Sequence, residues 1–145
     1  MFHQSEFYNI EQETAKLRTC LMIKTKIGME DYLTNIYNIT DRISMSKFTL
    51  YNHRLMIEVG RQENRKCPFC FNQVEDEIHF LTTCHVYSTC RNSLLMQLSI
   101  QNGSLNRSYL IFFMTDKYVV RFTTKFITKA MRICEFLLSK YRNNM

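Results

Sequence analysis

The sequence is poor in the residues that interrupt regular structure. Among 145 residues there are 3 glycines and 1 proline, and no low-complexity stretch breaks the chain. Disordered and fibrous proteins are rich in such features, so the composition excludes both classes and predicts a folded protein. With 46% hydrophobic residues, the chain can bury one core but not two comfortable ones. We therefore expect a single domain over residues 1–145.

Membrane and secretory segments are also missing. The longest apolar runs fall far short of the roughly 20 residues that a membrane-spanning helix needs, so no membrane partner is expected. The first residues, MFHQSEFYNIEQET, lack the basic and apolar regions of a secretory signal. These absences predict an intracellular protein, and a nuclear location is compatible with that prediction.

Motifs of the common enzyme classes are lacking as well. We find no glycine-rich phosphate loop, no G-x-S-x-G turn and no paired aspartates of a polymerase or nuclease. The zinc deaminases need H-x-E followed by P-C-x-x-C, and this chain has neither. We therefore expect no enzymatic activity and no small-molecule substrate.

What the sequence does contain is helical periodicity, which predicts a mainly α-helical fold. Apolar residues recur three or four positions apart through most of the chain. Gly28 and Gly60 are expected to end helices, and Thr40 and Asp41 to cap the one between them, although β-branched and aromatic residues leave a strand conceivable there. The expected helices span 5–26, 29–38, 42–60, 85–100 and 116–142, with a buried apolar segment at 109–115. The expected organisation is N-terminal helices in 1–41, a basic helix and linker in 42–66, a small embedded loop in 67–84 and C-terminal helices in 85–145.

The segment that Asp116 opens is the most periodic in the chain. Its apolar residues form one stripe and its cations another, and the two stripes lie on opposite faces of a helix. The expected core stripe is Val119, Phe122, Phe126, Ala130, Ile133 and Leu137, widened by Ile127, Cys134 and Leu138. The cations, called the basic ridge below, are Lys117, Arg121, Lys125, Lys129 and Arg132.

Three of the six cysteines fall together with a histidine inside one short segment. Cys67, Cys70, His79 and Cys84 form the pattern C-x2-C-x8-H-x4-C. In a reducing compartment, clustered cysteines are candidate metal ligands and not disulfides. A structural zinc ion takes four nitrogen or sulfur ligands in a tetrahedron, and a C-x2-C turn spans one edge of it. A catalytic zinc would keep one position open for water. The pattern therefore predicts one structural zinc ion in a small CCHC zinc knuckle.

The alternative is that these are free thiols in a core and a histidine on a helix. His85 could replace His79 as a ligand, but it follows Cys84 directly, and adjacent side chains rarely converge on one tetrahedron. The remaining cysteines, Cys20, Cys90 and Cys134, are expected to be core residues.

Charged residues flank the proposed ligands. Glu75, Asp76 and Glu77 precede the histidine, where carboxylates favour the start of a helix and could accept the free ring N–H of His79. Arg65 and Lys66 precede Cys67, where they would offset the net negative charge of three thiolates around one dication.

The run SKFTLYNHRLMIEVGR, followed by RKCPFC, VEDEIHFL, Cys84 and VYSTCRN, resembles the zinc-binding region C-terminal to the reverse transcriptase of non-LTR retrotransposons. The resemblance is strong over residues 45–91 and looser elsewhere, and Phe71 and Cys90 depart from the family's pattern. It implies the same four ligands and an accessory nucleic-acid-binding tail without polymerase or nuclease residues. The matched helix residues are Asn52, His53, Arg54, Gly60 and Arg61.

The formal charge of +6 also permits a nucleic-acid partner, RNA or DNA. Besides the basic ridge, cations recur every seven residues on one expected helix face before the knuckle, and together with the two cations that precede Cys67 they would surround the knuckle. A surface helix needs polar residues in any case, so a zinc-stabilised module that binds another protein is the competing hypothesis. The second set of cations is Lys47, Arg54 and Arg61, with Arg65 and Lys66, and the aromatic candidates for stacking on bases are Tyr51, Phe69 and Phe71.

Overall fold

The computed structural model describes residues 31–49, 66–71, 73–101 and 105–144. Over these residues the protein is mainly α-helical, as predicted, and no strand is present beyond one isolated bridge. The expected helix over 5–26 and the expected helix ends at Gly28 and Gly60 lie outside them. The helices are α3 (Asp31–Asn35), α4 (Ile39–Thr49), the π-helix η2 (His79–Thr83), the 3-10 helix η3 (His85–Tyr87), α6 (Ser88–Gln97), α7 (Arg107–Thr115) and α8 (Val119–Asn143).

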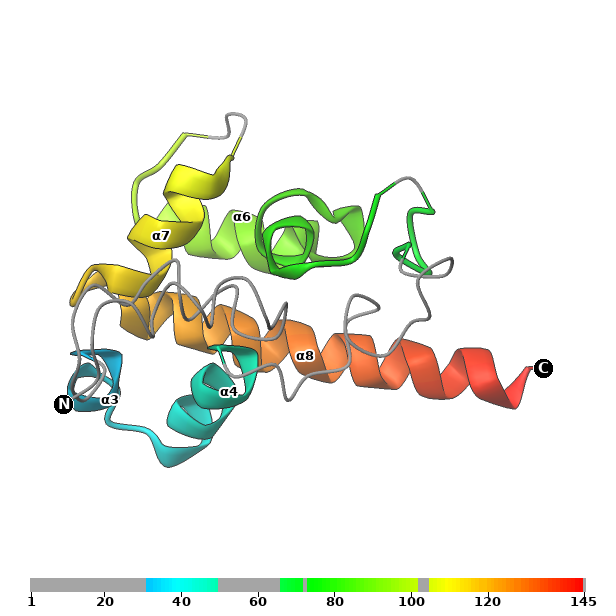
Figure 1. Cartoon of the computed structure of the whole chain (residues 1–145), viewed down its shortest axis with the longest axis horizontal. Coiled ribbons are helices and arrows are strands. Elements are labelled where there is room, and N and C mark those ends of the chain that lie inside the picture. The colour runs from blue at the N-terminus through cyan, green and yellow to red at the C-terminus, as the bar shows by residue number, and fades with distance from the viewer. Residues whose placement is uncertain (1–30, 50–65, 72, 102–104, 145) are drawn as a thin grey trace, which may run out of the picture.

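Helix α8 is the axis against which the other helices pack. It contacts α4, α6 and α7, and Figure 1 shows α6 and α7 along one side of it and α3 and α4 along the other. The C-terminal part of α8 extends beyond these neighbours (Figure 1). None of the described helices is long and apolar enough to cross a membrane.

The apolar stripe of α8 faces the core as predicted, but the buried face is wider than the stripe. Phe126, Ala130 and Cys134 are buried, whereas Phe122 and Ile133 are half-buried. Threonines beside the stripe are buried too, because neighbours cover α8 on two sides. Their hydroxyls donate to the carbonyl four residues back, which satisfies them within the helix, and the Thr128 hydroxyl also lies 2.9 Å from Asp41 Oδ1. These bonds are Thr123 to Val119 (3.2 Å), Thr124 to Val120 (2.6 Å) and Thr128 to Thr124 (2.9 Å).

Asp116 starts α8 as predicted. Its Oδ1 accepts from the backbone N–H groups of Tyr118 at 2.8 Å and Val119 at 3.0 Å. The caps predicted for α4 were wrong. That helix begins at Ile39, and Asn38 Oδ1 accepts from the Asp41 N–H at 3.1 Å. Asparagine is a strong N-cap residue and stands at the spacing that a cap requires, so it takes the place of Thr40 and Asp41.

The other predicted elements hold with shifted ends. The helix predicted over 29–38 stops at Asn35 within the described residues, and the segment predicted at 85–100 divides into η3 and α6. The apolar segment at 109–115 is the body of α7, whose N-cap is Asn106. Over 42–49 the chain is helical and not a strand, and 50–60 lies outside the described residues.

A cluster of aromatic rings joins the loop region to the helices. Phe80, at the start of η2, lies 5.6 Å from Phe48 of α4, 4.6 Å from Tyr87 of η3 and 6.0 Å from Phe126 of α8, measured between ring centroids. Tilted aromatic pairs at these distances attract one another beyond the area that they bury. The segment after the Cys67–Cys70 turn is thereby anchored in the core.

Candidate metal centre

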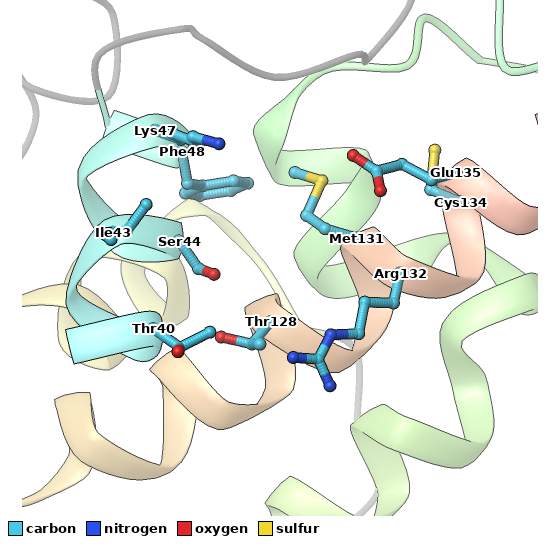
Figure 2. Close-up of a pocket in the computed structure, with 10 residues that line it drawn as sticks. All are labelled: Thr40, Ile43, Ser44, Lys47, Phe48, Thr128, Met131, Arg132, Cys134 and Glu135. Carbon is cyan, nitrogen blue, oxygen red and sulfur yellow. The ribbon is translucent and has the colours of Figure 1, made fainter. Parts of the chain in front are cut away.

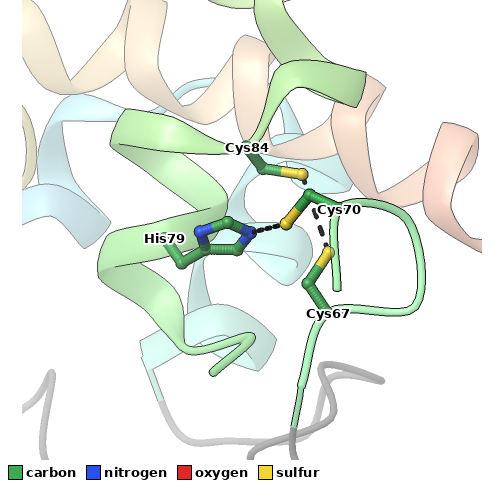
Figure 3. A group of neighbouring side chains, drawn as sticks. All are labelled: Cys67, Cys70, His79 and Cys84. Carbon is green, nitrogen blue, oxygen red and sulfur yellow. Dashed lines mark hydrogen bonds between the residues drawn. The ribbon is translucent and has the colours of Figure 1, made fainter. Parts of the chain in front are cut away.

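Cys67, Cys70, His79 and Cys84 come together at one point. Their ligand atoms all lie within 4.8 Å of one another, close enough to hold a metal ion. The sulfurs of Cys67 and Cys84 are 3.8 Å apart, and Cys70 Sγ lies 3.2 Å from His79 Nε2 (Figure 3). Sulfurs about 2.3 Å from a tetrahedral zinc ion would be about 3.8 Å apart. The observed separations therefore fit a four-coordinate ion with little rearrangement.

The first pair of ligands sits on a tight turn that returns the chain on itself. The Phe71 N–H donates to Cys67 O at 2.9 Å, and the Cys67 N–H donates to Gln73 O at 2.8 Å. Lys66 and Val74 then form an antiparallel bridge. Phe71 closes the turn with φ of 60°, in the left-handed region. It is 64% exposed. The left-handed conformation costs an ordinary residue roughly 1–2 kcal/mol, so Phe71 carries strain where glycine would carry none.

The second pair is placed by a π-helical turn. The Cys84 N–H donates to His79 O at 2.8 Å, a bond between residues five apart. In an α-helix, positions five apart point about 140° away from each other, so His79 and Cys84 could not face one ion. The wider π-turn brings the two side chains to the same side. Asp76 starts this turn, because its Oδ1 accepts from the His79 N–H at 2.8 Å.

The ring of His79 is oriented by Gln73 and Thr83, neither of which was predicted to do so. Its Nδ1 lies 2.9 Å from both Gln73 Oε1 and Thr83 Oγ1, which leaves Nε2 facing Cys70. The prediction that the acidic residues before His79 would accept this ring proton was wrong. Asp76 is engaged with the backbone, and Glu75 is buried with its Oε1 at 3.8 Å from Cys67 Sγ. A partner on Nδ1 fixes the ring so that Nε2 can act as a ligand.

The closeness of the thiols shifts the pKa values of Cys67 and Cys84. Hydrogen bonding with Cys84 and burial raise the pKa of Cys67 to about 12. The same hydrogen bond lowers the pKa of Cys84, and hydrogen bonding with Cys67 raises the pKa of His79. Three thiols at this distance cannot all ionise unless positive charge lies between them. A divalent cation would supply that charge and hold the thiolates together.

Arg91 of α6 is the functional residue that the sequence reasoning missed. It is 7% exposed, and its guanidinium donates to Leu81 O at 2.8 Å and to Cys84 O at 2.7 Å. It thereby satisfies carbonyls at the end of η2, where the π-turn stops and Cys84 is placed. Burial lowers the pKa of Arg91, and Cys84 and Cys90 oppose that shift.

Arg91 also brings a buried positive charge close to Cys84. Of the two cations expected to precede Cys67, Lys66 is exposed and Arg65 lies outside the described residues. A signal for Arg91 exists in the sequence, because it is the only lysine or arginine between Cys84 and Arg107 and stands one helical turn from Tyr87, Leu94 and Leu95. A lone cation in a segment that must pack is a candidate for a buried, hydrogen-bonded role.

Two of the three remaining cysteines and the alternative histidine fall where they were expected. Cys90 and Cys134 are buried in the core and are not among the four gathered ligands, and His85 is exposed. Cys20 lies outside the described residues.

Two sets of predicted basic residues meet on the surface. All five cations of the basic ridge, Lys117, Arg121, Lys125, Lys129 and Arg132, are exposed. Lys47 of α4 and Arg132 of α8 line a common pocket of about 450 Å³ together with Glu135 (Figure 2). Figure 2 shows hydroxyls of Thr40, Ser44 and Thr128 within the same pocket. Arg54, Arg61 and the aromatic candidate Tyr51 lie outside the described residues.

Of the other aromatic candidates for base stacking, Phe69 is half-buried against the core and Phe71 is exposed.

Comparisons of the chain with protein-family profiles, with curated proteins and with solved structures find no match.

Proposed function

We propose that the protein is a zinc-stabilised nucleic-acid-binding accessory domain, similar to the tail of a non-LTR retrotransposon reverse transcriptase and without catalytic residues of its own. In this proposal one structural zinc ion holds the knuckle, and basic helices bind RNA or DNA. The resemblance over residues 45–91 and the gathered ligand atoms of Cys67, Cys70, His79 and Cys84 support it.

The donor set favours zinc. Three thiolates and an imidazole are soft and borderline ligands, which suit zinc and disfavour magnesium or calcium. Four protein ligands complete a tetrahedron, which is the arrangement of a structural site. Cys67 and Cys84 are fully buried, so water has little access to the ion's position. The isolated bridge and single π-turn around the ligands are too small to be stable alone, and the ion would supply the missing free energy.

The observation that carries nucleic-acid binding is the exposed basic ridge on α8. Its cations are exposed although α4, α6 and α7 pack against α8, so they remain available to phosphates. The overall charge of +6 adds a favourable long-range field. Each phosphate contact releases counterions, so affinity should fall steeply as salt rises.

The test is a titration of fluorescently labelled RNA and DNA with the zinc-loaded protein at two salt concentrations. We expect binding whose log affinity falls with log salt by about 0.7 to 0.9 for each phosphate contact. Replacing Lys125 and Lys129 by glutamine should flatten that slope, whereas the same change at Lys140, near the far end of α8, serves as the control. Binding that ignores salt, or no binding at all, contradicts the proposal.

A protein-binding module is the second candidate, and one observation favours it. Ile39 and Ile43 lie one helical turn apart on α4, and both are exposed. Neighbouring exposed aliphatic residues are more typical of protein interfaces than of phosphate contacts. If the protein binds zinc but no nucleic acid, replacing both isoleucines by serine should abolish capture of a protein partner.

A further inference from the structure

Besides the pocket that Lys47 and Arg132 line, a groove lies where the loop between α3 and α4 meets α8. It measures about 430 Å³ and is lined by Ile36, Tyr37, Asn38 and Asp41 on one side and by Arg121, Phe122 and Lys125 on the other. Ile36 is buried and Phe122 half-buried, so the groove has an apolar floor. Tyr37, in contrast, is 81% exposed, although it is a large aromatic residue. An exposed aromatic ring beside an apolar surface is suited to stacking with a planar ligand.

The loop that carries Tyr37 is held in place on both sides. The guanidinium of Arg42 donates to Ile36 O from Nε at 3.2 Å and from Nη2 at 2.8 Å. On the other side, Asn38 O accepts from the Arg42 N–H at 3.0 Å and Asn38 Oδ1 caps α4. The backbone that carries Tyr37 is therefore fixed before any ligand arrives, which reduces the entropy lost on binding.

The charge of the groove is favourable for an anion. Arg121 and Lys125 lie one helical turn apart on α8, and both are exposed members of the basic ridge. Asp41 is the acidic residue of the groove, and its Oδ1 accepts from Thr128 Oγ1 at 2.9 Å. Two cations therefore outnumber one carboxylate that is already hydrogen-bonded.

Rings and cations in this arrangement suit one kind of nucleic acid. An unpaired base can leave its neighbours and stack on an aromatic side chain, while the phosphates on either side of it contact nearby cations. A base inside a duplex is stacked on both faces and cannot do this without being extruded. We propose that this groove binds an unpaired nucleotide of a single-stranded nucleic acid, with its base stacked on Tyr37 and the adjoining phosphates held by Arg121 and Lys125.

This inference rests on the proposed function and adds to it the strandedness of the ligand. The experiment compares labelled oligouridine, labelled oligothymidine and a duplex of the same length, using the full zinc-loaded chain. We expect the single strands to bind more tightly than the duplex. Tyr37→Ala should weaken single-strand binding by about tenfold, because one stacked base typically contributes this much, and should leave duplex binding unchanged. Tyr37→Phe should bind like the wild type, because it keeps the ring.

Matched controls separate stacking from unfolding. Tyr141→Ala removes another tyrosine, 55% exposed, near the end of α8 and outside the groove, and should change nothing. Arg121→Gln and Lys125→Gln should each weaken single-strand binding more than Lys140→Gln does. Zinc content and helical circular dichroism should match the wild type in every variant, because these side chains are exposed.

The two proposals fail in different ways. If the wild type binds neither single strands nor duplex, the proposed function fails and this inference fails with it. If the wild type binds and Lys129→Gln weakens it, but Tyr37→Ala does not, the function stands and the groove is ruled out. Tighter binding to the duplex than to either single strand also rules out the groove.

Discussion

The knuckle and α8 reach defined structures by different physical routes. Helix α8 is specified by a local pattern, because its apolar stripe, its basic ridge and its Asp116 start signal all agree. The knuckle has one bridge, one π-turn and a strained Phe71 in place of regular structure. Its shape depends on residues far apart in sequence, such as Cys67 and Cys84, meeting at one point. A periodic helix therefore tolerates local change, whereas the knuckle should depend on a few groups.

Removing a ligand should break the knuckle and give the largest effect. Cys67→Ser is expected to abolish stoichiometric zinc binding and to lower the melting temperature strongly, since structural zinc contributes free energy on the order of 10 kcal/mol. Native mass spectrometry and thermal melting measure both. Cys90→Ser is the control, because Cys90 is also buried but is not among the four gathered ligands. If the two serine variants behave alike, the metal centre is disproved.

Shortening a buried side chain of α8 tests how the helix, in contrast to the knuckle, responds to a change. Phe126→Ala removes a buried ring that contacts Phe80, and should cost about 3–5 kcal/mol of unfolding free energy. Below the melting transition the variant should still bind one zinc ion, because no ligand has changed. Chemical denaturation and zinc stoichiometry on the same sample measure the two quantities. Loss of zinc from the folded variant would mean that the knuckle and α8 are not separable.

Arg91 links the knuckle to α6, which packs against α8, and its replacement should show an intermediate effect. Arg91→Met keeps much of the side-chain volume but leaves the carbonyls of Leu81 and Cys84 without their donor. We expect a loss of about 2–4 kcal/mol and zinc affinity reduced by about 10- to 100-fold. Competition with a chelator measures the affinity, and Arg107→Met, at an exposed position, is the control. Unchanged zinc affinity would limit Arg91 to a packing role.

Alkaline pH should destabilise the protein through Tyr87. Burial raises the pKa of this phenol far above its ordinary value of about 10, so the folded state holds the neutral form. The stability linked to Tyr87 is therefore fully present below about pH 10 and is lost as pH rises above it, because only the unfolded chain can release the proton. Denaturation at a series of pH values should show this loss in the wild type and a smaller one in Tyr87→Phe. Equal pH dependence in the two proteins would exclude Tyr87 as the cause.

Relieving strain in the turn after Cys70 should give the smallest effect, and a favourable one. Phe71→Gly removes the left-handed penalty, and since glycine also costs unfolded-state entropy, the net gain should be about 1 kcal/mol or less. Phe71→Ala keeps the penalty and should not stabilise. Denaturation of the zinc-loaded proteins compares them, and equal stability of the glycine and alanine variants would contradict the strain.

The parts that sequence reasoning predicted are those governed by spacing. The four ligands, the core positions of Cys90 and Cys134 and the two faces of α8 each follow from residue types at fixed intervals, which the backbone geometry converts into position. Gln73 and Arg91 could not be recognised in this way. Their roles depend on a π-turn and on the packing of α6 against η2, and neither follows from a repeating interval.

By itself the sequence determined that the protein is mainly helical, that its most periodic helix exposes a row of cations, and which four side chains can share one ion. Periodicity and ligand chemistry are local properties, so they can be read from the order of the residues. Only the tertiary structure decided which side chain orients His79, which buried cation lies beside the thiols, and that Tyr37 faces Arg121 and Lys125 across a groove. Those relations depend on how separate helices pack, and packing is a property of the whole fold.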